Sequence, residues 1–225
     1  MKVSIIIPVY NESETLLDII GRVFAQPINC EKEIVIVDDK STDSSLEILH
    51  RLKQEYNFAL CEHPKNLGKG AALNTGLTQA TGDIILFQDA DLEYNPADWP
   101  KLIALFDDQR TQVVYGCRTS AGYKKYYLGS KVLTSFINLL YGADLKDPYT
   151  CYKVIRKSLL DNLEIKSVGF EFEAELTAKI LRRGIQIIQV PISYNPRTFA
   201  EGKKIRFLRD GILGLWTFIK YRFKS

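Results

Sequence analysis

The sequence predicts a single α/β domain whose mostly parallel sheet is covered by helices on both faces. Short apolar runs alternate with segments of helical periodicity through the first half of the chain, as in a sheet built from strand–helix–strand units. The longest runs have continuous apolar centres, such as "III" and "IVIV", which is typical of strands buried on both faces. The chain has 225 residues, of which 46% are hydrophobic and 25% charged, and these values fit one ordinary globular domain.

Five strands are expected in this half of the chain. The first, "VSIIIPV", is a continuous and mostly β-branched run over residues 3–9, and such residues favour extended structure. "EIVIVDD" over 33–39 and "DIILFQD" over 83–89 have the same character. "FALCEH" over 58–63 is a shorter run, and "QVVYG" over 112–116 is the fifth.

Three helices are expected between these strands. Residues 41–56 begin with Ser, Thr and Asp, which are favourable N-caps. Residues 68–80 form a segment rich in small side chains. The helix over residues 13–26 places its apolar side chains on one side, at Leu16, Leu17, Ile20, Val23 and Phe24.

A basic amphipathic helix is expected at the end of the chain. Residues 201–225 contain seven Lys or Arg and two acidic residues, a net charge of +5, although the whole chain carries only +3. We therefore treat residues 1–203 as the α/β domain and residues 204–225 as this helix within the same domain. Such a helix either lies in a membrane surface or packs on the sheet, and the basic excess favours the membrane. Residues 123–142 repeat the pattern with tyrosines and lysines.

Carboxylates gather where the expected strands end. Glu12 follows the first strand, Asp38 and Asp39 end the second, and Asp89 and Asp91 end the fourth. The carboxyl ends of parallel strands meet at one edge, where ligands bind, so these side chains should face one crevice. Oxygen donors of this kind suit Mg²⁺ or Mn²⁺ with substrate phosphates. They also suit a ribose or base, because a carboxylate accepts hydrogen bonds from hydroxyl and N–H groups.

Several classes of protein are disfavoured. The chain has neither GxxxxGK[ST] nor GxGxxG after a strand, which argues against P-loop and dinucleotide-binding enzymes. "GKG" over 68–70 is a weak phosphate signal whose alternative is a helix start that needs close packing. Four distant cysteines and two histidines predict no zinc site, no disulfide framework and a reducing cytoplasm. Because the positive charge is confined to the tail, we expect no nucleic-acid partner.

Four motifs, "SIIIPVYNE", "VDDKSTD", "NLGKGAALNTG" and "DADLEYNP", resemble those of the family 2 glycosyltransferases. The resemblance implies a GT-A-type nucleotide-binding fold. In the second half, "LKDPYTCYKVIRK", "GFEFEAELTAKILRRG" and "VPISYNPRTFAEGKKI" are similar to the polyprenyl-phosphate sugar synthases, which include dolichyl-phosphate mannose synthase. The implied activity is the transfer of one sugar, with mannose from GDP-mannose as the first choice, to a polyprenyl phosphate with inversion.

The resemblance also implies roles for individual residues. Asp89 and Asp91 match the DxD motif that holds Mg²⁺ or Mn²⁺ on the diphosphate, and we expect Glu93 to be a third metal ligand. Asp89, Asp91 and Arg118 are the implied catalytic residues. The implied nucleotide-binding residues are Pro8, Tyr10, Asn11, Glu12, Asp38, Asp39, Lys69 and Asp89.

We expect positively charged side chains to bind the acceptor phosphate. Arg118 matches an arginine of the family, and Arg197, Lys203 and Lys204 fall on its basic element, here stretched to "RTFAEGKK". A lipid phosphate is already an anion, so it needs no general base. Lys146 and Asp147 are either neighbours of this site or a solvated ion pair.

Two other functions stay open. A glycosyltransferase acting on a hydroxyl of a glycan or glycolipid would take its base from Glu171, Glu173 or Glu175. A catalytically silent module would only bind a nucleotide sugar. No run approaches the roughly 18 apolar residues of a membrane span, so we expect a peripheral protein at the cytoplasmic face of a membrane. A tighter anchor would come from a membrane-protein partner.

Overall fold

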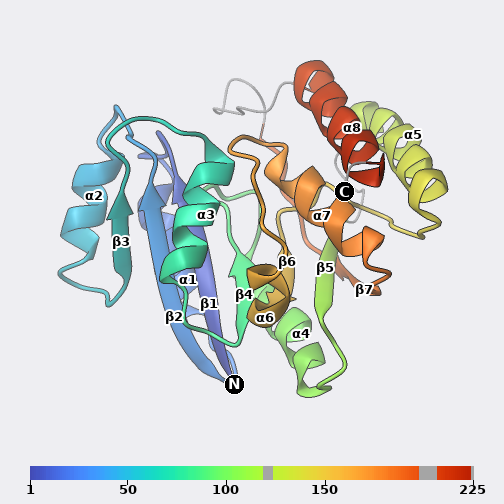
Figure 1. Ribbon diagram of the computed structural model, residues 1–225. Helices are drawn as coiled ribbons and strands as arrows, with labels where there is room; N and C mark the ends of the chain where they lie inside the picture. The colour runs from blue at the N-terminus through green and yellow to red at the C-terminus, as the bar shows by residue number, and fades with distance from the viewer. Residues whose placement is uncertain (119–123, 198–206, 224–225) are drawn as a thin grey trace.

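The computed structural model describes residues 1–118, 124–197 and 207–223, and for residues 124–129 and 207–210 it describes only the backbone. It contains a seven-stranded sheet with the strand order β3-β2-β1-β4-β6-β5-β7 (Figure 1). The strands are β1 Lys2–Val9, β2 Glu31–Asp38, β3 Ala59–Glu62, β4 Ile84–Phe87, β5 Val113–Arg118, β6 Lys153–Arg156 and β7 Ile187–Ile192.

The first four strands form a parallel unit. β1 pairs with β2 on one side and with β4 on the other, and β2 pairs with β3, all in parallel register. Ile5, Ile6 and Ile7 at the centre of β1 are fully buried, as expected for a strand covered on both faces. The five predicted strands are confirmed, each within a few residues of its expected bounds.

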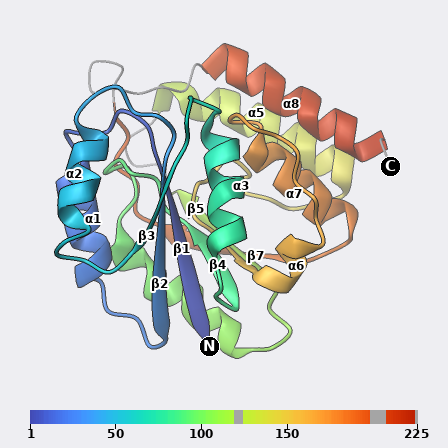
Figure 2. The same ribbon diagram turned by 60° about the vertical axis from the view of Figure 1, so that its left-hand side comes forward.

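The helices cover both faces of the sheet. In Figure 2, α1 and α2 lie on one side of the sheet, and α3, α6 and α7 lie on the other. The α-helices are α1 Leu16–Ala25, α2 Ser45–Leu52, α3 Lys69–Gln79, α4 Trp99–Ile103, α5 Lys124–Tyr141, α6 Lys157–Asp161, α7 Phe172–Arg182 and α8 Phe207–Phe223. The predicted α/β architecture is therefore confirmed.

The second helix begins later than the sequence predicts. It starts at Ser45 instead of residue 41, because the preceding polar residues bind the loop after β1. Asn11, whose φ is +49°, accepts the N–H of Thr42 at 2.7 Å and donates its own N–H to the Ser41 hydroxyl at 3.0 Å. The expected N-cap residues thus join two loops at the carboxyl edge of the sheet.

Two strands in the second half were not predicted. β6 runs antiparallel to both of its neighbours, β4 and β5, while β7 is parallel to β5. β6 has only four residues and begins with Lys153, so it does not read as a buried strand. Its position beside β4 brings the second half of the chain against the DxD motif.

The C-terminal helix packs on the domain with one face and exposes the other. α8 lies against α7 and beside α5 (Figure 1), and Phe218 is fully buried. On the outer side, Ile212 and Trp216 are 67% and 61% exposed. None of the helices in the described ranges is long and apolar enough to span a bilayer.

Candidate functional site

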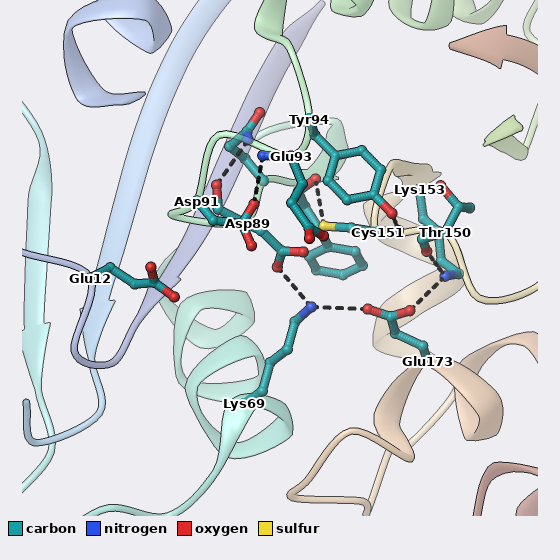
Figure 3. A network of polar contacts seen from close by, with 12 residues as sticks. Glu12, Lys69, Asp89, Asp91, Glu93, Tyr94, Thr150, Cys151, Lys153 and Glu173 are labelled. Carbon is teal, nitrogen blue, oxygen red and sulfur yellow. Dashed lines mark hydrogen bonds and ion pairs between the residues drawn. The ribbon is translucent and has the colours of Figure 1, made fainter. Parts of the chain in front are cut away.

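The candidate site lies at the carboxyl edge of the sheet, where the sequence predicts it. The loop after β1, the end of β2, the start of α3 and the segment after β4 all contribute side chains to it. The segment that follows β7 reaches the same place, because Arg197 contacts Glu12 and Asp91. Figure 3 shows the polar contacts around the DxD motif.

Asp39 is held by donors that belong to the fold. Its Oδ1 accepts the Leu67 N–H at 2.8 Å and the His63 ring Nδ1–H at 2.7 Å, and its Oδ2 accepts the Gly68 N–H at 2.8 Å. The Nε2 of His63 is hydrogen-bonded to the Thr75 hydroxyl at 2.9 Å. This buried carboxylate therefore fixes the loop that leads into α3. The orientation of the carboxylate itself is set by the fold before any ligand binds.

Asp38, its neighbour, has a different environment. It is 1% exposed, and its Oδ2 accepts the N–H of Ser41 at 3.1 Å. Its Oδ1 is buried and has no hydrogen-bond partner among the described residues. Of the two aspartates that were predicted to bind the nucleotide, only Asp38 keeps an unused buried acceptor.

The glycines around Lys69 are required for close packing. Gly68 has a φ of +98°, and a Cβ there would lie 2.5 Å from the carbonyl oxygen of Val168. A Cβ on Gly70 would lie 2.8 Å from the carbonyl oxygens of Ser167 and Gly169. The two glycines of "GKG" therefore serve the close packing of a helix start, which was the alternative to a phosphate-binding role. Lys69 itself points to the DxD.

Two side-chain cations pair with the DxD carboxylates. The Lys69 ammonium lies 2.7 Å from Asp89, and the Arg197 guanidinium lies 2.8 Å from Asp91. Arg197 also pairs with Glu12 at 2.8 Å. Residues predicted for nucleotide, metal and acceptor phosphate are thus brought together within one cluster.

Glu93 faces the segment after β7. Its carboxylate accepts the Tyr194 hydroxyl at 2.8 Å and the Arg197 N–H at 2.7 Å. The Asn195 N–H donates to the Glu93 carbonyl at 2.9 Å. In this arrangement Glu93 holds the segment after β7 against the DxD motif, and its predicted role as a metal ligand stays a prediction.

The electrostatics of the two DxD carboxylates differ. Burial, together with the neighbouring charges of Asp89 and Glu93, raises the pKa of Asp91 to about 7 despite Arg197. Burial acts in the same direction on Asp89, but the adjacent Lys69 ammonium lowers its pKa below the ordinary value. Asp91 is therefore the carboxylate that a further cation would stabilise most.

The donor set fits a hard divalent cation, although it does not form a closed metal site. Asp89 and Asp91 supply the carboxylate oxygens that Mg²⁺ and Mn²⁺ prefer. Within the described part of the chain, no three His, Cys, Asp or Glu side chains are placed to hold a metal together. Oxygens of the substrate diphosphate would complete such a site.

Arg118 is held rigidly at the end of β5. Its guanidinium forms two hydrogen bonds with Asp147, at 2.6 and 2.8 Å, and lies 5.0 Å from the centre of the Tyr194 ring. The Asp147 carboxylate and the Tyr194 ring keep the Arg118 guanidinium in place, and Tyr194 links it to Glu93. Asp147 is thus a neighbour of this site, whereas Lys203 and Lys204 lie outside the described residues.

Sequence reasoning missed Lys153 beside the site and named Glu173 only as a possible base for a hydroxyl acceptor. Glu173 lies 3.1 Å from Lys69 and 3.3 Å from Lys153. Lys153 is fully buried. A lysine within the run "CYKVIR" was the available signal, because a charge in a buried strand requires a partner.

Comparisons with known proteins agree with the motifs. Residues 4–164 match the profile described as "Glycosyl transferase family 2". The chain is 30% identical over 211 residues to the dolichol-phosphate mannosyltransferase of Pyrococcus furiosus, a match that covers 90% of this chain. This chain spans only 59% of the length of that relative.

Solved structures of one other enzyme share the fold. Glucosyl-3-phosphoglycerate synthase from Mycobacterium tuberculosis, in complex with Mn²⁺, UDP and phosphoglyceric acid, matches with a TM-score of 0.76 and 20% identity. The match covers 98% of this chain and 78% of that protein. The same enzyme with Mg²⁺ and UDP matches with a TM-score of 0.68 and 22% identity, covering 89% and 73%.

Proposed function

The chain belongs to glycosyl transferase family 2, and we propose that it moves one sugar from a nucleoside diphosphate sugar to a polyprenyl phosphate. GDP-mannose is the first choice of donor, because the chain is similar to a dolichol-phosphate mannosyltransferase. The observation that carries the proposal is the pairing of Arg197 with Asp91 at 2.8 Å. This contact supports the proposal, because Arg197 belongs to the segment expected to bind the acceptor and Asp91 to the motif expected to bind the donor diphosphate.

The residues divide the work between donor and acceptor. Asp38, Asp39 and the loop of Asn11 lie where a base and ribose would bind, at the carboxyl ends of β1 and β2. Lys69 and the DxD lie where the diphosphate would bind. Arg118 and Arg197 would bind and orient the acceptor phosphate, since a guanidinium matches phosphate oxygens in pairs.

Asp89 and Asp91 would hold Mg²⁺ or Mn²⁺, with Glu93 as a further ligand. A bound divalent ion would neutralise the departing nucleoside diphosphate. Crystals of the structurally similar glucosyl-3-phosphoglycerate synthase contain Mn²⁺ or Mg²⁺ with UDP, which supports this choice of cofactor. The raised pKa of Asp91, about 7, supports it independently, because an added cation would relieve the repulsion between the carboxylates.

The environment of the candidate bases favours a phosphate acceptor over a hydroxyl. Glu175 is fully buried, and its hydrogen bonds with Ser167, Lys166 and Lys179 outweigh burial and lower its pKa to about 2. Glu173 is paired with two lysines. Glu171 accepts the Gly169 N–H at 3.1 Å. A general base needs a free carboxylate near the acceptor, whereas an anionic acceptor needs only cations.

An exposed apolar surface on α5 and α8 supports docking to a membrane, where a polyprenyl phosphate resides. The two helices lie side by side, and Leu139, Ile212 and Trp216 are 84%, 67% and 61% exposed. The exposed large apolar side chains on these two helices are Val132, Phe136, Leu139, Ile212, Leu213, Trp216 and Phe223. Exposed apolar patches of this kind mark protein or membrane contacts, and nearby Lys220 and Arg222 suit anionic lipid headgroups.

The function is tested by assaying a panel of nucleotide sugars against a short, water-soluble polyprenyl phosphate with Mn²⁺. We expect one donor to give a single transfer per acceptor, with the corresponding dephosphorylated polyprenol inactive. Transfer to the polyprenol alone, or to a glycan, would favour the hydroxyl-acceptor function. Binding of nucleoside diphosphate with no turnover on any acceptor would favour a silent module.

The membrane surface is tested separately with anionic vesicles. Replacing Leu139, Ile212 and Trp216 by Ser should release the protein from vesicles, while transfer to the water-soluble acceptor stays unchanged. The control is Leu17→Ser, which changes a 47% exposed leucine on α1. Equal vesicle binding by both variants would exclude this surface as the membrane contact.

A further inference from the structure

A line of alternating charges runs inward from the DxD motif. The Lys69 ammonium lies between Asp89 at 2.7 Å and Glu173 at 3.1 Å, and Glu173 continues to the Lys153 ammonium at 3.3 Å (Figure 3). The four residues come from α3, the segment after β4, α7 and β6. Lys153 and Glu173 have no role in the proposed function described so far.

The charge of Lys153 is unfavourable at its position in the fold. Its side chain is fully buried, and removing a charged ammonium from water is unfavourable unless the ammonium is paired. Its ammonium donates to the carbonyl of Thr150 and lies 5.0 Å from the Tyr115 ring centre. Among the described residues, Glu173 is the carboxylate that pairs with it.

The backbone holds Glu173 in place. The Ala71 N–H donates to the Val168 carbonyl at 2.9 Å, so the loop before α7 packs on the first turn of α3. Gly70 allows this contact, because a Cβ there would lie 2.8 Å from three atoms of the loop. Glu173, in the first turn of α7, is thus anchored to the same turn that carries Lys69.

The charges explain why both residues are needed. A lysine side chain loses rotamer freedom when it is held in one place, and Glu173 holds Lys69. Glu173 alone would add a negative charge beside a site that receives a diphosphate. Buried Lys153 cancels that charge, so the pair orients Lys69 without repelling the substrate.

We propose that Glu173 and Lys153 are positioning residues that hold Lys69 beside Asp89, where Lys69 binds the phosphates of the nucleoside diphosphate. The inference rests on the proposed function and deepens it. It also gives Glu173 a role other than that of a general base.

Calorimetric titration of GDP and of UDP, each with Mn²⁺, tests the proposal. Glu173→Gln should weaken binding of the preferred nucleotide on the order of tenfold, the range for directly interacting residues. Asp161→Asn, which breaks an exposed ion pair with Lys157 on α6, is the matched control and should bind as the wild type does. A merely structural role would lower the fraction of protein that binds, seen in the stoichiometry, and would leave Kd unchanged.

A mutant cycle with Lys69→Met shows whether Glu173 acts through Lys69. In the Lys69→Met background, adding Glu173→Gln should change Kd by less than about twofold, because the group that it positions is absent. An undiminished effect in that background would overturn the proposal. So would an unchanged Kd in Glu173→Gln alone.

The double variant Lys153→Met/Glu173→Gln covers the case in which Glu173→Gln alone does not fold. It leaves no unpaired buried charge, so it should fold and should still bind the nucleotide on the order of tenfold more weakly. Wild-type affinity in this folded variant would overturn the proposal. If neither nucleotide binds the wild-type chain, the proposed function fails and this inference fails with it; loss confined to the variants leaves the function standing.

Discussion

Asp39 and Asp91 lie at the same edge of the sheet, yet different kinds of partner balance their carboxylates. Asp39 is 3% exposed and accepts two backbone N–H groups and one histidine N–H. Asp91 is 9% exposed, and its charged partner is the guanidinium of Arg197, which extends from a segment more than 100 residues later in the chain. Backbone donors move only when the fold moves, whereas a long side chain can exchange one anion for another.

The difference indicates what each carboxylate is for. Asp39 belongs to the permanent structure of the sheet edge, because it fixes the loop before α3. Asp91 has a pKa near 7, so it is incompletely balanced by the protein and suited to an arriving cation. Four changes to the protein or its conditions would break or sharpen this comparison.

The largest expected effect is that of Asp91→Asn on transfer. Loss of the carboxylate that would hold the metal should reduce turnover by roughly 100-fold or more at saturating Mn²⁺. The fold should stay intact, because removing one crowded anion relieves repulsion. A transfer assay measures the loss, with Asp18→Asn on α1 as the control. Near-normal turnover would remove the metal assignment.

Asp39→Asn should instead reduce stability. Asparagine has one acceptor oxygen, so its NH₂ group would face a backbone N–H of Leu67 or Gly68, and a buried donor without a partner costs about 1–3 kcal/mol. Urea unfolding of this variant beside Asp91→Asn compares the same chemical change at the two sites. Equal free energies of unfolding would mean that the two carboxylates are balanced alike.

The affinity for Mn²⁺ should depend on pH through Asp91. Burial and the charges of Asp89 and Glu93 raise its pKa from 3.8 to about 7, and a proton must leave before a metal binds. The affinity should rise by up to about tenfold per pH unit below 7 and level off above it. Titrations from pH 5.5 to 8.5 would check this, and Asp91→Asn should lose the dependence.

The same shift has a consequence for stability. Between pH 3.8 and about 7 the folded protein keeps a proton on Asp91 that the unfolded chain releases. The contribution of Asp91 to stability therefore falls as pH rises through this window. Asp91→Asn should gain stability relative to the wild type at pH 8, and no gain would mean that the carboxylate is already well balanced.

The smallest effect is expected from Arg197→Gln. Without the guanidinium, which lies 2.8 Å from Asp91 and from Glu12, Mn²⁺ alone should bind a few-fold more tightly. The measurement belongs at pH 8.5, above the raised pKa of Asp91 in the wild type, which is about 7. Arg110→Gln, which breaks an exposed pair with Asp108, is the control. Weaker Mn²⁺ binding would mean that Arg197 holds Asp91 in place instead of competing for it.

Local pattern was a good guide where one element could be recognised by itself. The run over residues 3–9 predicts β1 because its side chains are apolar on both faces, and the acidic residues after β4 follow directly from that strand. β6 was missed because Lys153 interrupts a strand of only four residues. The start of α2 was misplaced because Ser41 and Thr42 bind Asn11 instead of capping the helix.

The sequence by itself determined the α/β class, the edge of the sheet at which carboxylates collect, and the family to which the motifs belong. Only the tertiary structure decided which charges meet. Lys69 pairs with Glu173 across 104 positions of the chain, and Arg197 pairs with Asp91 across 106. The hydrophobic periodicity of a segment shows on which face of its helix or strand a residue lies. This information is local, because it depends only on residues that are close in sequence. An ion pair between distant segments depends on how β6, β7 and α7 pack, and no local pattern contains that information.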